Sequence, residues 1–153
     1  MEILFWTTAI GFIASLTMAI FLTFIDKLNV ANSQDFWIFG KLFFNKETQA
    51  RTYGLACHII AGIIFSFAYI YIWSHFSVHL IYYPILGLIT GSVHGVAVGI
   101  TQIAVLTNLE GGLRVGLIHA SSHAVFGFTL GILVAILDYT DNFMSAFHSF
   151  INF

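Results

Sequence analysis

Four long apolar segments, at residues 3–25, 53–73, 81–106 and 115–137, constrain the fold of this chain more than any other feature. Each exceeds the roughly 20 residues that an α-helix needs to cross about 30 Å of hydrocarbon. The segments are continuously apolar, whereas a lipid-exposed barrel strand alternates over about 10 residues. The chain is 59% hydrophobic and only 8% charged, against roughly 25% in soluble domains. We therefore expect an all-α, integral membrane four-helix bundle that forms a single domain over residues 1–153.

The basic residues predict the orientation of the bundle. Lys27, Lys41, Lys46 and Arg51 lie between the first and second segments, and Arg114 lies between the third and fourth. Lysine and arginine concentrate in cytoplasmic loops. Both termini and the loop at 74–80 are therefore expected on the outer side of the membrane.

Aromatic residues and two additional segments are expected at the membrane surface, where amphipathic rings prefer the headgroup level. Residues 35–44 are predicted to form a short interfacial helix, and so is the C-terminal segment, because its apolar residues recur at helical spacing. Each of these helices would contact either lipid or a neighbouring subunit. The aromatic residues at the predicted outer ends are Phe5, Trp6, Tyr71, Trp73, Tyr82, Tyr83 and Tyr139, and the C-terminal apolar residues are Phe143, Phe147, Phe150 and Ile151.

Every predicted spanning helix carries a stripe of small or polar residues. Helices in lipid associate through such stripes, because lipid offers no hydrophobic drive and close packing must supply the attraction. A bundle with a semi-polar core is therefore predicted. The stripes are Thr8, Gly11 and Ser15; Gly54, His58, Gly62 and Phe65; Gly87, Thr90, Gly91, His94, Gly95, Gly99, Thr101 and Gln102; and Gly116, His119, Ser122, His123 and Gly127.

Four histidines lie inside the apolar segments, at His58, His94, His119 and His123. A polar side chain in hydrocarbon is costly unless it faces protein, water or a cofactor, so all four are expected to point into the bundle. Imidazole is a common ligand of copper, zinc and haem iron. These four residues are therefore the candidate metal ligands of the chain.

The depths of the four histidines limit which of them can share a ligand. At about 1.5 Å per residue, His94 lies near the membrane centre and His123, His58 and His119 lie successively closer to the cytoplasm. A copper or zinc ion would bind either His94 with His123, or His58 with His119 and His123. A haem b would be held between His58 and His123. In the alternative interpretation the histidines only pack, through hydrogen bonds to Thr90, Ser121, Ser122 or Gln102.

A short internal repeat relates two of these helices. His58-x-x-x-Gly62 in the second helix matches His123-x-x-x-Gly127 in the fourth, and both helices run from the cytoplasmic side outward. If the two helix hairpins are related by a pseudo-two-fold axis, His58 and His123 face one another.

The cysteine content, the net charge and the absence of catalytic motifs exclude several classes of function. Cys57 is the only cysteine, and we expect it to be a small buried apolar residue, because consecutive helical residues point in different directions. The net charge of −2 gives no basic face for nucleic acid. The chain has no nucleophile elbow, no zinc-protease motif and no pair of acidic residues within a span. We therefore do not expect an enzyme.

Three stretches carry a resemblance to a known group of proteins. Residues 58–69, the segment from Gly87 to Gly95, and the segment from Ser122 to Gly131 together resemble an uncharacterised family of small four-helix prokaryotic integral membrane proteins. The resemblance covers the second to fourth helices. It implies the bundle fold, the prokaryotic cytoplasmic membrane and the positions of His58, His94 and His123, and it implies no activity.

Three functions are compatible with these observations. The first is a small subunit or accessory protein of a larger membrane complex, in contact with lipid and with other membrane-protein subunits or a second copy of itself. The second is a haem b or copper/zinc-binding membrane protein in electron transfer or metal handling. The third is a small transporter or proton-conducting oligomer that uses the polar stripes as a path.

Overall fold

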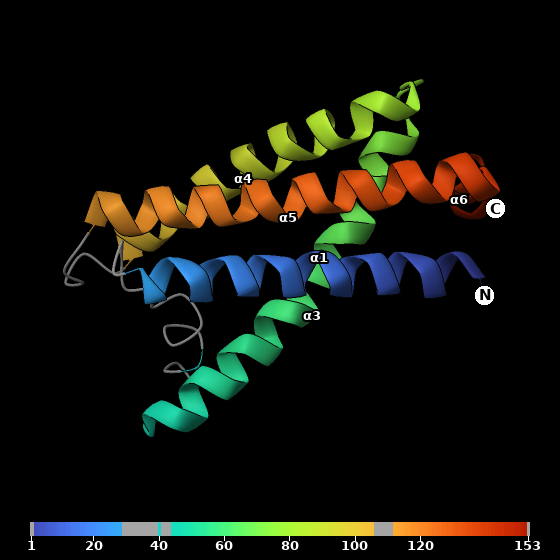
Figure 1. Ribbon diagram of the computed structural model, residues 1–153. Helices are drawn as coiled ribbons and strands as arrows, with labels where there is room; N and C mark the ends of the chain where they lie inside the picture. The colour runs from blue at the N-terminus through green and yellow to red at the C-terminus, as the bar shows by residue number, and fades with distance from the viewer. Residues whose placement is uncertain (1, 29–39, 41–43, 106–111, 153) are drawn as a thin grey trace.

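The computed structural model describes residues 2–28, 40, 44–105 and 112–152, and every regular element in these ranges is helical. The elements are α1 (Glu2–Lys27), α3 (Glu47–Ser74), the short 3-10 helix η1 (Leu80–Tyr82), α4 (Tyr83–Val105), α5 (Gly112–Asp141) and α6 (Phe143–Ile151) (Figure 1). Four of them are long and apolar enough to cross a membrane. The predicted all-helical fold with four spans is confirmed, and the N- and C-terminal ends lie at the same end of the bundle (Figure 1).

α4 and α5 form the most closely packed helix pair, because glycines let their backbones approach one another. A Cβ on Gly87, Gly91, Gly95 or Gly99 would collide with the backbone of α5; on Gly95 it would lie 2.6 Å from the Cα of Ala120. Small residues let two helix backbones approach closely, which is how helices associate in lipid. The glycine run of α4 therefore packs within this chain against α5.

α1 packs against α3 through close contacts of small residues, which are fewer than those between α4 and α5. Gly11 packs against Ser66 of α3, and Gly62 of α3 packs against Ser15 of α1. The predicted stripe of α1 is wrong at one position, because Thr8 is exposed whereas Thr7 is fully buried. One residue turns a helix by about 100°, so the buried face of α1 runs through Thr7, Gly11, Ser15 and Met18.

α3 crosses α1 steeply, and its N-terminal half lies apart from the other helices (Figure 1). It packs mainly on α1 and α6. It meets α4 and α5 through large side chains, with Phe65 against His94 and Tyr69 against Phe126. The space that these side chains bridge lies next to the four histidines, and it contains the cavity described below.

The apolar core is concentrated at the end of the bundle that holds the termini. Trp73 is fully buried and packs against Tyr69 and Tyr83, which are 6% and 3% exposed. The rings of Trp73 and Tyr83 therefore face the interior of the bundle, and their predicted position at the headgroup level stays a prediction. Tyr71, Tyr82 and Tyr139 remain exposed, as such rings should be.

α6 folds back onto its own bundle. The turn into it passes through Asn142, whose φ of 50° asparagine tolerates well, and the carboxylate of Asp138 accepts a 2.8 Å hydrogen bond from the backbone N–H of Met144. Phe143 and Phe147 are buried against the neighbouring helices. We expected Phe143, Phe147, Phe150 and Ile151 to contact lipid or another subunit. Phe143 and Phe147 contact this chain's own core instead, Ile151 packs partly against it, and Phe150 stays exposed. The other predicted interfacial helix, at 35–44, lies outside the described residues except for Gly40 and Phe44.

Candidate functional site

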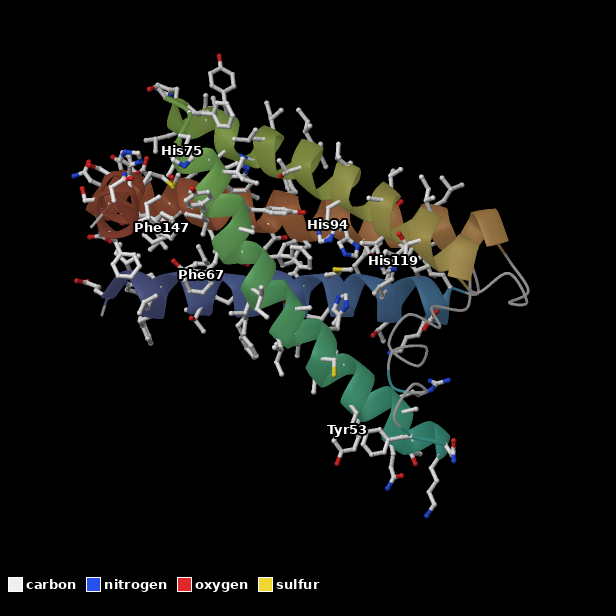
Figure 2. All side chains as sticks on the ribbon, turned by 180° about the vertical axis from the view of Figure 1, so that it is seen from behind. Tyr53, Phe67, His75, His94, His119 and Phe147 are labelled. Atoms are coloured by element: carbon white, nitrogen blue, oxygen red, sulfur yellow. The ribbon has the colours of Figure 1, made fainter. Side chains whose placement is uncertain are left out.

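A cavity of about 260 Å³ lies among α1, α3, α4 and α5. All four intramembrane histidines line it, so the prediction that they point toward protein rather than lipid agrees with their positions; in Figure 2 the labelled His94 and His119 lie between the helices. No aspartate, glutamate, lysine or arginine is among the residues that line it. They are Met18, Cys57, His58, Ala61, Gly62, Phe65, His94, Val98, His119, His123 and Phe126.

His123 is the centre of the histidine cluster. Its ring centroid lies 4.4 Å from that of His119, 4.6 Å from that of His94 and 6.3 Å from that of His58. His119 and His123 are also the most buried of the four, at 1% and 8% exposure, whereas His58 and His94 are half-buried. His123 thus has ring contacts with each of the other three histidines, and it belongs to both of the sets predicted from depth.

The hydrogen bond of His123 determines which of its ring nitrogens can bind a ligand. Its Nδ1–H donates to the backbone carbonyl of His119 at 3.1 Å. A neutral imidazole that donates from Nδ1 presents a lone pair on Nε2. Metal-binding histidines are commonly oriented in this way, by donation from the second nitrogen to a carbonyl. His123 is thus oriented as a metal ligand would be.

His94 is held by Tyr69 of α3. The Tyr69 hydroxyl and His94 Nδ1 share a 2.9 Å hydrogen bond, and the ring of Phe65 lies 4.1 Å from that of His94. These contacts fix the imidazole through Nδ1 and leave Nε2 as its second donor or acceptor. The bond bridges α3 and α4 where their backbones are not in close contact.

His58 meets a sulfur atom rather than a hydroxyl. Its Nε2 lies 3.2 Å from Sδ of Met18, which is 1% exposed on the inner face of α1. The ring plane of His58 is nearly perpendicular to that of His123, at 83°. A nitrogen and a soft sulfur therefore lie side by side at the wall of the cavity.

The hydroxyls that we considered as histidine partners bond elsewhere. Thr90 Oγ1 donates to the carbonyl of Leu86, and Ser121 and Ser122 donate to carbonyls of their own helix. Buried serine and threonine hydroxyls readily satisfy themselves on the preceding turn. The fourth considered partner, Gln102, lies in α4. Its side chain is outside the part of the chain that the structure describes.

The sole cysteine differs from expectation. Cys57 is exposed, and it lines the cavity together with the adjacent His58. Within the described ranges, no set of three or more histidine, cysteine, aspartate or glutamate side chains is grouped as a metal site. The copper or zinc prediction for His58, His94, His119 and His123 therefore rests on pairs of imidazoles, and it stays a prediction.

The internal repeat corresponds to a spatial relation. Gly62 packs on α1, the first helix of its hairpin, and Gly127 packs on Gly87 of α4, the first helix of the other hairpin. The histidines four residues before these glycines face one another across the bundle. The two hairpins thus contribute equivalent positions to the opposite walls of one cavity.

Among the residues of the site that sequence reasoning missed are Met18, Tyr69 and Phe126. The spacing contained a signal for two of them. Met18 follows Ser15 at three residues and Gly11 at seven, and Tyr69 follows Gly62 at seven, so both continue stripes that had been recognised. Both stripes end too early in the sequence-based prediction because it followed small and polar residue types and not the period itself.

Comparison with known proteins gives no match: no family model fits the chain, and no curated protein and no solved structure is significantly similar to it. The resemblance to small prokaryotic four-helix membrane proteins therefore stays a prediction, and the site is interpreted from its own chemistry.

Proposed function

We propose that this protein binds a transition-metal ion inside a membrane-spanning helical bundle and acts in metal handling. The observation that supports this most is the convergence of His58, His94, His119 and His123 on one cavity, with Nδ1 of His123 engaged by a carbonyl. Buried imidazoles in an apolar span are costly and mark function by default. Their orientation by second partners is the arrangement that metal-binding histidines require.

The size of the cavity favours an ion over a haem. Its volume of about 260 Å³ is below the roughly 300–1,000 Å³ of pockets that hold drug-sized ligands. The residues present do not fit a haem held between His58 and His123, and we derive no chemistry through one.

The experiment is a metal analysis of the purified protein. The full chain, carrying a tag without histidines, is loaded with copper(I), zinc or iron in detergent, desalted and measured by mass spectrometry. We expect about one ion per chain in the wild type and a loss of bound ion in the His58→Ala/His123→Ala double variant. The matched control is His75→Ala/His148→Ala, a second pair of histidines in ring contact at 5.8 Å, outside the cavity.

Two results would contradict the proposal. One is a wild-type protein that retains no transition metal after loading with any of the three. The other is an ion that survives in the cavity variant and is lost from the control variant.

We further propose that the chain is inserted in a prokaryotic cytoplasmic membrane with both termini outside. α1 ends at the basic residue Lys27, and α3 begins next to Lys46, at the end of the bundle opposite the termini (Figure 1). Arg51 lies in the first turns of α3. Basic residues favour the cytoplasmic side, which supports this orientation.

A second candidate function is a small subunit or accessory protein of a larger membrane complex, formed with other subunits or with a second copy. An exposed apolar face of α3 supports it: Tyr53, Ile60 and Ile64 are 49%, 58% and 62% exposed, and Figure 2 shows Tyr53 on the part of α3 that leaves the bundle. Helices in membranes associate by packing along such faces. Purification from native membranes in mild detergent tests it; the expected particle contains more than one chain, and a monomer would contradict it.

A further inference from the structure

We propose that the ion held in this cavity is copper(I), and that the Met18 thioether binds it together with Nε2 of His58. This inference rests on the proposed function and deepens it, because it names the ion and adds a ligand from α1. Four features of the cavity lead to it: the contact between the two donor atoms, the types of donor, the absence of charge in the lining, and the small number of ligands that come together.

The donor atoms of Met18 and His58 lie close enough to reach one ion. The sulfur and the nitrogen are 3.2 Å apart, in hydrogen-bond contact. For bonds of about 2.3 Å to sulfur and about 2.0–2.1 Å to nitrogen, two ligand atoms lie about 3.5 Å apart at a tetrahedral angle and about 4.3 Å apart in a linear arrangement. Binding therefore requires an unprotonated Nε2 and a separation of the two atoms by about 0.3 to 1.1 Å, which a methionine with three rotatable bonds supplies.

The donor types select a soft ion. Thioether and thiol sulfur prefer copper(I), and imidazole accepts it, whereas carboxylate and carbonyl oxygen prefer harder ions. The cavity wall offers the sulfur atoms of Met18 and Cys57 beside its imidazoles, and it offers no carboxylate.

The single charge of copper(I) also favours it over divalent ions. No acidic side chain lines the cavity, so an ion bound by thioether and imidazole keeps its full charge. The cost of placing a charge in an apolar medium rises with the square of that charge. A monovalent ion is therefore tolerated far better than zinc(II) or iron(II) at this depth.

The number of ligands also fits copper(I). A structural zinc ion takes four protein ligands, and no three histidine, cysteine, aspartate or glutamate side chains of the described residues are grouped for a metal. Copper(I) is stable at low coordination numbers. The pair of Met18 and His58, with the lone pair of His123 Nε2 on the opposite wall, is sufficient for it.

The first experiment requires no substitution. The protein is produced with selenomethionine, loaded anaerobically with copper(I), and studied by X-ray absorption at the copper edge. We expect a copper–selenium scattering path, which Cys57 cannot produce. Bound copper without selenium in its shell would overturn the inference while leaving the proposed function intact. Preferential binding of zinc over copper(I) would do the same, and a protein that binds no metal would overturn both.

The second experiment assigns the selenium to one residue. The chain has three methionines, and Met144 is buried in α6 and does not line the cavity. Met18→Leu should abolish the selenium path and weaken copper(I) binding, measured against a chromogenic chelator, by about 10- to 100-fold, since even loss of an outer-shell partner costs that much. Met144→Leu should leave both unchanged. A Met18→Leu protein that folds and retains the path or the affinity would overturn the assignment.

Discussion

At the level of single residues, the site depends on how each imidazole is oriented by a second contact. His123 donates to a backbone carbonyl, His94 bonds to a tyrosine hydroxyl, and His58 touches a thioether. The sequence alone predicted the four inward-facing histidines, because the cost of imidazole in hydrocarbon is a property of the residue type. It could not predict the partners of His94 and His58, since these come from other helices at sequence separations of 25 and 40 residues.

The hydrogen bond between Tyr69 and His94 predicts how much the Tyr69 hydroxyl contributes to the stability of the fold. Tyr69→Phe removes it while keeping the ring that packs on Phe126, and we expect a loss of about 0.5–1.5 kcal/mol in the free energy of unfolding. Steric trapping in detergent or bicelles measures this quantity. Tyr71→Phe is the control, because Tyr71 is 50% exposed.

A double-mutant cycle with His94→Ala separates the bond from general effects of either substitution. The coupling energy between the two positions should account for most of the loss seen in Tyr69→Phe. Additive effects of the two substitutions would contradict a direct bond.

At the level of helices, the chain divides into a tightly packed hairpin and a looser one. α4 and α5 approach through glycines along their whole contact, whereas α3 leaves α1 at a steep angle (Figure 1). The tight hairpin holds His94, His119 and His123 at fixed relative positions, and the looser one brings His58 and Met18 to the same cavity.

A bulky side chain at the glycine contact should separate α4 from α5. Gly91 faces the backbone of His123 so closely that a Cβ alone would collide with it. We expect Gly91→Leu to cost about 1–3 kcal/mol of unfolding free energy and to weaken metal binding, because it displaces His123. Ala97→Leu, at an exposed position of the same helix, should change the stability by less than about 0.5 kcal/mol. Equal effects of the two substitutions would contradict the glycine contact.

The helices themselves could be predicted from sequence far better than the faces they bury. Continuous apolar runs identify spans almost directly, and the α4 glycine run identified a packing face. The face of α1 was wrong by one residue at Thr8, because a few small residues define a stripe less sharply than a regular repeat. The docking of α6 could not be predicted, since Phe143 and Phe147 have the same spacing whether lipid, another subunit or this core covers them.

At the level of the whole molecule, four apolar helices bring both termini to one end of the bundle (Figure 1), and the described basic residues Lys27, Lys46 and Arg51 lie toward the ends of α1 and α3 away from them. α3 crosses the other helices at a steep angle (Figure 1), and the cavity lies among α1, α3, α4 and α5. Neither the angle of α3 nor the existence of a cavity has a signature in one sequence, because both depend on how large side chains from distant helices fit together.

The orientation predicts which side each end of the bundle faces. In a Cys57→Ser background, Ser149→Cys in α6 should react with a membrane-impermeant maleimide added to intact cells, and Lys46→Cys before α3 should react only after the cells are opened. Both original side chains are exposed, so burial does not limit either reaction. The reverse pattern of labelling would show that the termini are cytoplasmic.

The central claim is that one metal ion is bound among the intramembrane histidines. Anomalous diffraction at the absorption edge of the loaded metal, from crystals of the full chain, tests it most directly because it locates the ion. The account predicts a single strong peak in the cavity between His58 and His123, within bonding distance of Met18. A peak at His75 and His148 alone, or no peak in crystals soaked with copper(I), would contradict it.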